Sequence, residues 1–307
     1  MERDLNMEIT AAMVKELREK TDCPMMDCKK ALIENAGDIE KSVDYLRKKG
    51  MATAKAKADR TANEGVVYTI VAPDHKTGIL VEVNCETDFV ARNDGFQAFV
   101  KDVAEHVMEA KPKYLKAEEA PAGEKAEAVC LLEQPYAKNK ALKVSDFIAE
   151  KVGSIKENLG VKRFAIYGSG LVHSYIHMGA KLGVLLEMEC DAALAKNEEY
   201  IEMAKDLTMQ IAAANPLCLE RADVPADLLE KEKEIYRAQM ADQKKPADIL
   251  EKIINGKMNK FYEERCLVEQ VFVKDTTIKV NQYVTDKNKK IGSPVKIKRF
   301  VRFEIGK

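Results

Sequence analysis

An internal repeat limits the folds open to this chain of 307 residues more than any other feature. Segment 65–85 matches segment 170–190 at a spacing of 105 residues, with Gly65 on Gly170 and Cys85 on Cys190. The spacing falls to 104 over 91–112, and it rises to 136 over 131–164. Order of this kind over roughly 100 residues predicts two copies of one structural unit.

Each copy has the pattern of an α+β unit, in which a β-hairpin precedes a helix and a second helix and a strand follow. We therefore expect a two-copy core with antiparallel sheets. The later spacing exceeds the earlier one by 32 residues (136 − 104), which places an insertion in the second copy between Pro216 and Cys266. Apolar residues recur there at helical spacing on both sides of a turn at 242–246, so the insertion predicts an antiparallel helical hairpin paired as a coiled coil. The expected stripes are Leu228, Leu229, Ile235, Tyr236 and Met240 before the turn, and Ile249, Leu250, Ile253, Ile254, Met258 and Phe261 after it.

Residues 8–50 predict three short helices. Pro24 cannot continue the first helix, Asp38 is a suitable cap for the third, and Gly50 is expected to stop it. Met25 and Met26 lie at the loop between the first two helices. They suit either a core gap or an exposed contact surface, because the thioether side chain is flexible and apolar.

These patterns divide the chain into four parts: a three-helix domain at 7–51, a linker at 52–62, a first core half at 63–167, and a second core half at 168–307. The hairpin is expected at about 223–263 within the last part. Met1 to Asn6 precede a second methionine, Met7, and are expected to be an extension.

The corner Thr87-Asp88-Phe89-Val90 stands where an apolar strand ends and a helix begins. Thr87 or Asp88 can cap that helix with a side-chain oxygen. Phe89 either folds back on the core or fills a pocket in a partner. In place of the five residues Glu86-Thr87-Asp88-Phe89-Val90, the second copy has only Asp191-Ala192-Ala193-Leu194, one residue fewer, so the unit folds without this ring. That comparison favours binding, because an exposed aromatic ring is a common anchor of an interface.

Composition excludes several classes of protein. The 50 basic and 51 acidic residues nearly cancel, and there is no tryptophan, which argues against direct nucleic-acid binding. The seven cysteines are scattered and form no C-x-x-C pair, so we expect free, mostly buried thiols and a cytoplasmic protein. No apolar run is long enough to span a membrane, and we expect no signal peptide.

No motif indicates covalent catalysis or a cofactor. The chain lacks a G-x-S-x-G sequence, a phosphate-binding glycine loop and a cysteine–histidine pair with a third, orienting group. His173 and His177 have no third ligand at metal spacing, so we expect no metal site there, although a polar contact with a partner stays open for His177. The sequence predicts a protein that is not an enzyme.

The chain closely resembles the elongation factor Ts family, whose members are guanine-nucleotide exchange factors of the translation GTPase EF-Tu. The resemblance covers nearly the whole chain from Met7 onward. The motifs that carry it include 17–21 (LREKT), 25–32 (MMDCKKAL), 37–40 (GDIE), the Thr87–Val90 corner, 175–177 (YIH) and 302–304 (RFE).

The resemblance implies an N-terminal domain like the ubiquitin-associated (UBA) fold, a two-part core and a protruding coiled coil. It also implies that Asp88 and Phe89 enter the GTPase domain of EF-Tu near its magnesium site. Four residues, Arg18, Met25, Met26 and Lys29, stand where the family's N-terminal domain touches the same GTPase domain. His177 matches a contact to another EF-Tu domain.

The resemblance implies a mechanism, GDP release from EF-Tu, and leaves other points open. The corner would disturb the Mg²⁺ and phosphate contacts, so that factor and nucleotide weaken each other's binding.

The hairpin could serve a homodimer, a second EF-Tu contact or neither. The C-terminal helical module of some relatives is not expected here, and the lack of a transit segment favours a bacterial over an organellar source. A scaffold or adaptor is the competing class, and a small-molecule enzyme would need a deep pocket between the repeats.

Overall fold

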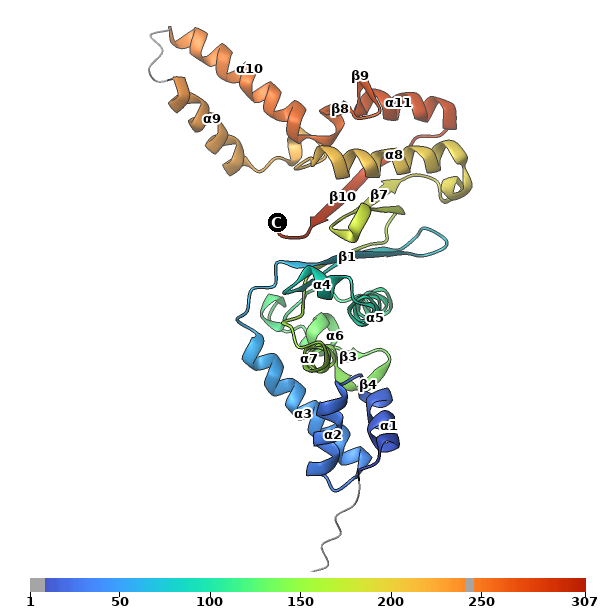
Figure 1. The fold of residues 1–307 in the computed structure, drawn as a ribbon. Coiled ribbons are helices and arrows are strands. Elements are labelled where there is room, and N and C mark those ends of the chain that lie inside the picture. Colours follow the sequence, from blue (N-terminus) through green and yellow to red (C-terminus); the bar gives the residue numbers. More distant parts are fainter. Residues whose placement is uncertain (1–8, 241–245) are drawn as a thin grey trace, which may run out of the picture.

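The computed structural model describes residues 9–240 and 246–307. The molecule is elongated, with a helical N-terminal part, a central body of two stacked sheets and a helical hairpin at the other end (Figure 1). Both three-stranded sheets are antiparallel throughout, which confirms the predicted α+β class. The expected extension Met1–Asn6 lies outside the described residues, and so does the expected turn at 242–246 except for Pro246.

The first repeat contains one sheet of order β1-β2-β5 with helices on one side of it. Its elements are β1 Glu64–Val71, β2 Gly78–Cys85, α4 Asp88–Ala91, α5 Asp94–Ala110, α6 Ala126–Val129, β3 Pro135–Tyr136, β4 Asn139–Lys143, α7 Val144–Ile155 and β5 Gly160–Tyr167.

The second repeat has the same order of elements around the sheet β10-β7-β6. Its elements are β6 Leu171–Ile176, β7 Leu182–Glu189, α8 Glu198–Ala214, β8 Val271–Phe272, β9 Asp275–Lys279, α11 Val280–Ile291 and β10 Lys296–Glu304. Glu82 of β2 and Glu187 of β7 lie 105 residues apart and occupy the same place in their sheets, and α11 begins 136 residues after α7. The predicted repeat is therefore confirmed for the strands and the main helices, whereas in the described residues the short helices α4 and α6 occur only in the first half.

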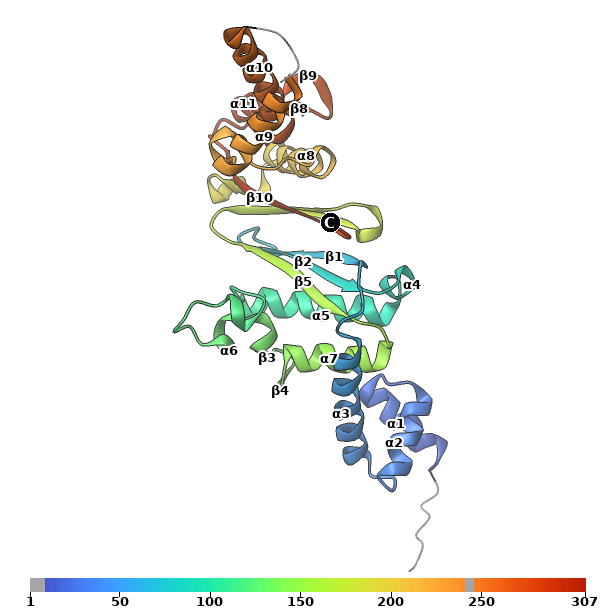
Figure 2. The same ribbon diagram turned by 90° about the vertical axis from the view of Figure 1, so that its left-hand side faces the viewer.

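The two sheets pack face to face, and the helices lie outside them (Figure 2). Val67 and Leu80 of the first sheet form an apolar cluster with Val172 and Leu185 of the second. The helix α5 covers the outer face of the first sheet and α8 that of the second, while α7 and α11 pack against these two helices. Each half thus has a core of its own, and a third core joins the halves.

Two ion pairs, each between a buried glutamate and a partly exposed arginine, repeat the same arrangement on the two sheets. Glu82, on β2, accepts a hydrogen bond from Arg163 Nε at 2.6 Å, and the Arg163 guanidinium lies over the Phe303 ring of the other half. Glu187 accepts the matching bond from Arg299, whose guanidinium lies over Tyr167. Burial raises the pKa of Glu187, but the bonds from Ser169 and Arg299 outweigh it and lower the pKa. Because each arginine also covers a ring of the opposite half, these pairs help to fix how the halves stack.

The N-terminal helices are α1 Ala11–Thr21, α2 Met25–Glu34 and α3 Ile39–Lys57, and they enclose a small core of their own. Thr10 caps α1, and Asp38 caps α3 as predicted. The prediction that Gly50 stops the third helix is wrong, since α3 continues for seven residues beyond it, to Lys57.

Tertiary packing explains why the glycine does not end the helix. A Cβ atom on Gly153 of α7 would lie 2.7 Å from the Gly50 Cα, so the two helices touch through their backbones. Ion pairs flank this contact, from Arg47 to Glu150 at 3.5 Å and from Lys151 to Asp22 at 3.0 Å. The N-terminal helices are therefore packed firmly on the first half of the core.

The inserted helices α9 Ala226–Met240 and α10 Ala247–Arg265 pack on each other and project from the second half (Figure 1). A backbone bridge between Cys218 and Cys266 closes their base, where the first half has a bridge between Tyr114 and Cys130. Most of the predicted stripe residues meet between the helices. Ile235 and Ile249 do not, because they are 40% and 42% exposed.

Candidate partner-binding site

The corner predicted from the sequence is a short helix, α4, at one end of the first sheet (Figure 2). Thr87 is the capping residue, since its hydroxyl accepts a hydrogen bond from Val90 N–H at 3.3 Å. The Cys85 thiol donates to the Thr87 carbonyl at 3.2 Å, and burial raises the pKa of that thiol to about 12, which keeps it a donor. The Cys85 thiol at the end of β2 therefore holds the backbone of the corner in place.

Phe89 lies on the outside of this corner and is 82% exposed. The alternative in which the ring folds back on the core is therefore wrong. Val90 is half-buried and Ala91 is buried, and both belong to the core of the first half. A large ring left in water next to well-packed neighbours gains nothing from the fold itself.

Asp88 lies beside the ring and is half-exposed. Its carboxylate forms an ion pair with Arg92 at 3.1 Å, one helical turn later. An exposed pair of this kind stabilises the corner little, so both groups can exchange this contact for one with a partner.

Glu157 is the residue at this site that the sequence reasoning missed. Its carboxylate accepts hydrogen bonds from the N–H groups of Glu86 and Thr87 at 3.0 Å each, and from the Thr87 hydroxyl at 2.6 Å. Some 70 residues separate these partners in the chain, so no local pattern signals the contact. A signal was nonetheless present in the repeat, because Ser293 stands 136 residues after Glu157 in place of the acid.

The equivalent corner of the second half shows what the fold alone requires. There Asp191 caps a 3₁₀ turn, Ala192–Lys196, by accepting from Ala193 N–H. Leu194 is half-buried and packs on its core, as Val90 does in the first half. The second corner keeps the apolar residue that packs on the core and has no counterpart of the exposed Phe89 ring.

The four N-terminal residues singled out from the resemblance are all exposed. Met25 and Met26 begin α2 with 57% and 73% of their surface in solvent, so of the two alternatives left open, core filling is wrong for both and exposure is confirmed. Lys29 follows one turn later on the same helix, and Arg18 lies near the end of α1. In Figure 2 these two helices and α4 lie on the same side of the molecule.

The two histidines of the second half lie in different surroundings. His177 is exposed, and its Nδ1 is 3.0 Å from the Tyr175 hydroxyl. His173 is buried, with Nε2 3.0 Å from the Tyr200 hydroxyl and its ring stacked on His75 at 4.8 Å. Within residues 9–240 and 246–307, no group of three or more histidine, cysteine or acidic side chains could hold a metal ion.

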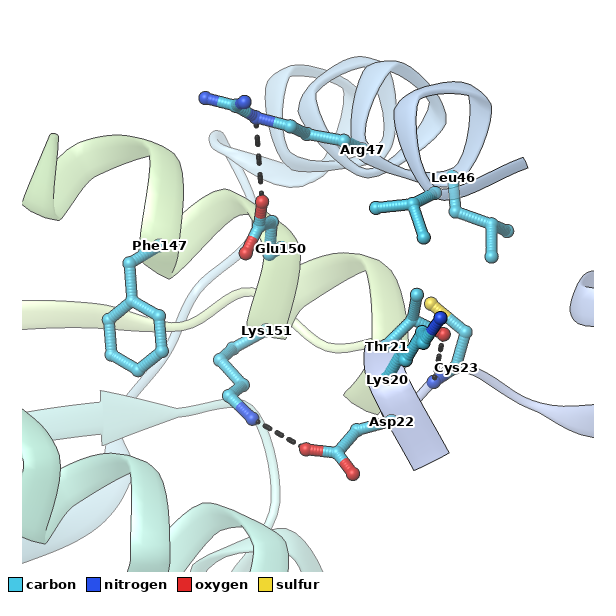
Figure 3. Close-up of a pocket in the computed structure, with 10 residues that line it drawn as sticks. Lys20, Thr21, Asp22, Cys23, Leu46, Arg47, Phe147, Glu150 and Lys151 are labelled. Carbon is cyan, nitrogen blue, oxygen red and sulfur yellow. Dashed lines mark hydrogen bonds and ion pairs between the residues drawn. The ribbon is translucent and has the colours of Figure 1, made fainter. Parts of the chain in front are cut away.

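A cavity of about 150 Å³ lies between the N-terminal helices and α7. Figure 3 shows Arg47 facing Glu150 and Lys151 facing Asp22 across it, so its charged groups form ion pairs with one another. Burial raises the pKa of Glu150, and the charge of Arg47 opposes that shift. The cavity is a gap at a packed interface between elements.

Comparison with known proteins identifies the family. The family model for elongation factor Ts matches residues 86–307. A curated elongation factor Ts of Trichlorobacter lovleyi is 46% identical over 303 residues, covering 98% of this chain and 93% of the relative. The corresponding proteins of Clostridium perfringens strain SM101 and Clostridium kluyveri strain ATCC 8527 are 46% and 43% identical over 300 residues, and each comparison covers 97% of this chain and 93% of the relative. The chain belongs to the elongation factor Ts family.

Membership in the elongation factor Ts family makes this chain a translation elongation factor that acts in nucleotide exchange and is not an enzyme. It confirms the resemblance inferred from the motifs. None of the described helices is both long and apolar enough to cross a membrane.

Proposed function

We propose that this elongation factor binds EF-Tu in its GDP-bound form and promotes GDP release by inserting the Thr87–Val90 corner near the Mg²⁺ and phosphate site. The observation that carries the proposal is the exposure of Phe89 on a corner whose equivalent in the second half has no such ring. A rigid aromatic side chain in solvent is suited to enter a pocket, because it brings a large apolar surface and loses little conformational freedom.

The mechanism is a negative coupling between two ligands of the GTPase. Bound GDP owes part of its affinity to Mg²⁺ and to backbone N–H groups around its phosphates. Phe89 would displace the GTPase segment that holds the Mg²⁺ and the phosphates, and Asp88 would place the Phe89 ring. Because coupling is reciprocal, a protein that binds the empty GTPase more tightly than the GDP-bound GTPase lowers the affinity for GDP by the same ratio. The corner performs no covalent chemistry.

Other surfaces would hold the complex together. Arg18, Met25, Met26 and Lys29 are exposed on α1 and α2, on the same side of the molecule as the corner, and would contact the same GTPase domain. His177 would contact a second EF-Tu domain. Ile235 and Ile249 leave apolar surface on the hairpin, which would serve a homodimer or a further EF-Tu contact.

The finer architecture belongs to the same proposal. We propose a UBA-like domain at 7–51, a linker at 52–62 whose residues up to Lys57 continue α3, core halves at 63–167 and 168–307, and a coiled-coil hairpin at about 223–263. The proposed setting is the cytoplasm, without direct contact to nucleic acid or membrane.

The test is stopped-flow release of fluorescently labelled GDP from EF-Tu, with and without this protein. A coupling of a few kcal/mol predicts that release accelerates about 100-fold or more at saturating factor. Binding without acceleration would support the adaptor alternative and refute the exchange function. The absence of binding would refute both.

A further inference from the structure

The segment Lys156-Glu157-Asn158 joins α7 to β5 and contacts three separate parts of the chain. Lys156 ends α7 in the left-handed conformation, with φ at 69°. That turn allows adjacent side chains to reach opposite sides. Lys156 Nζ lies 2.9 Å from Asp27 Oδ2 of α2, whereas Glu157 reaches the corner.

Glu157 satisfies three donors at the corner. One carboxylate oxygen accepts both backbone N–H groups of Glu86 and Thr87, and the other accepts the Thr87 hydroxyl. That hydroxyl is the cap of α4, so Glu157 orients the group on which the helix begins. The contact is reciprocal, because Asn158 N–H donates to Glu86 Oε1 at 2.7 Å.

The segment is itself anchored on the N-terminal side. The Asn158 side-chain amide donates to the carbonyl oxygens of Ala58 and Arg60, at 3.3 and 2.7 Å. Asp27 is also bound by Lys49 Nζ at 2.7 Å, which fixes the end of the Lys156 contact. Glu157 thus connects the corner to a segment held at several points.

The second half keeps the turn and lacks the acid. Gly292 stands 136 residues after Lys156 with φ at 72°, and Ser293 and Pro294 take the places of Glu157 and Asn158. The second half therefore completes the same α7-like helix, turn and strand without a carboxylate. As with Phe89, the fold does not require the residue.

We infer that Glu157 is a positioning residue for exchange, which holds the α4 corner so that Phe89 enters the GTPase in one orientation. This inference rests on the proposed function. A ring on an untethered corner would still bind, but it would spend less time in the productive position.

The test is a double-mutant cycle on labelled GDP release, measured over a range of factor concentrations. Glu157→Ala is expected to lower the maximal rate about tenfold and to change the half-saturating concentration less than about twofold. In the Phe89→Ala background the same substitution should change the rate less than about twofold. Glu157→Gln should restore most of the rate, because its amide oxygen can accept both N–H groups while its amide N–H faces the Thr87 hydroxyl.

Ser293→Ala is the matched control and should leave the rate unchanged. An equal loss from Glu157→Ala in both backgrounds would mean a general effect on folding and would overturn the inference, as would no loss in either. Failure of the unmodified protein to accelerate release would instead refute the proposed function.

Amide hydrogen exchange of the free protein tests the tether without EF-Tu. Glu157→Ala should speed exchange at the Glu86 and Thr87 N–H groups at least about tenfold, since both lose their acceptor. Unchanged exchange at these two positions would overturn the inference by itself.

Discussion

His173 connects the two halves at the level of a single side chain. It is buried between His75 of the β1–β2 turn and Tyr200 of α8. Burial, with a smaller contribution from the charge of His75, lowers the pKa of His173 from 6.5 to about 4. The neutral imidazole is therefore the form that fits the folded protein.

This shift predicts a stability that falls in acid. Between about pH 6.5 and pH 4 the unfolded chain takes up a proton at His173 that the folded chain does not. The contribution of neutral His173 to the free energy of unfolding is full above pH 6.5 and decreases by roughly 3 kcal/mol as the pH falls to 4. The free energy of unfolding, measured with denaturant from pH 7 to pH 5, should fall less steeply for His173→Gln than for the native protein. Equal slopes would contradict this assignment.

Phe89 and Glu157 show what the sequence can and cannot reveal about single residues. Phe89 could be singled out, because the repeat supplied a second corner without the ring. Glu157 was missed, because its partners are distant in the chain and its role depends on where three donors meet in space. Met25 and Met26 could be singled out from their place between two predicted helices, but the choice between core filling and exposure needed the packed helices.

Among the helices and strands, the repeat made most of the fold predictable. Strand, helix and return strand recur at fixed spacings, and two copies of a weak pattern are more informative than one. Gly50 was misjudged for a physical reason. Sequence rules treat a glycine as a local helix stop, whereas here it permits a close contact with Gly153 of another helix.

The contact between α3 and α7 gives a prediction on stability. Gly153→Ala places a Cβ atom 2.7 Å from the Gly50 Cα, where only a shift of one helix can relieve the clash. We expect a loss of about 1–3 kcal/mol in the free energy of unfolding. Limited trypsin digestion should also cut faster around Lys55 to Arg60, as the N-terminal helices loosen.

Gly256→Ala in α10 is the matched control, because its Cβ atom would meet no other atom within 4 Å. That change should leave the free energy of unfolding unchanged or raise it by up to about 1 kcal/mol. Equal effects of the two substitutions would show that the glycine contact does not hold the helices together.

For the molecule as a whole, duplication explains both the body and the site. The two halves stack through a shared apolar cluster and matched arginine–ring contacts, and each half builds its own core. Features that differ between the halves are not required by the shared fold and are available for function. They are Phe89 and Glu157 in the first half, and the hairpin in the second. The exchange proposal assigns the first of these differences to the GTPase.

The central claim is that Phe89 acts on GDP release and not on the fold. The most direct measurement is the maximal rate of factor-stimulated release of labelled GDP, for Phe89→Ala against Ile201→Ala, an exposed apolar residue of α8. Phe89→Ala should lower that rate at least about tenfold with its unfolding curve unchanged, and Ile201→Ala should leave the rate as it is. A well-folded Phe89→Ala protein that releases GDP at the native rate would contradict the account.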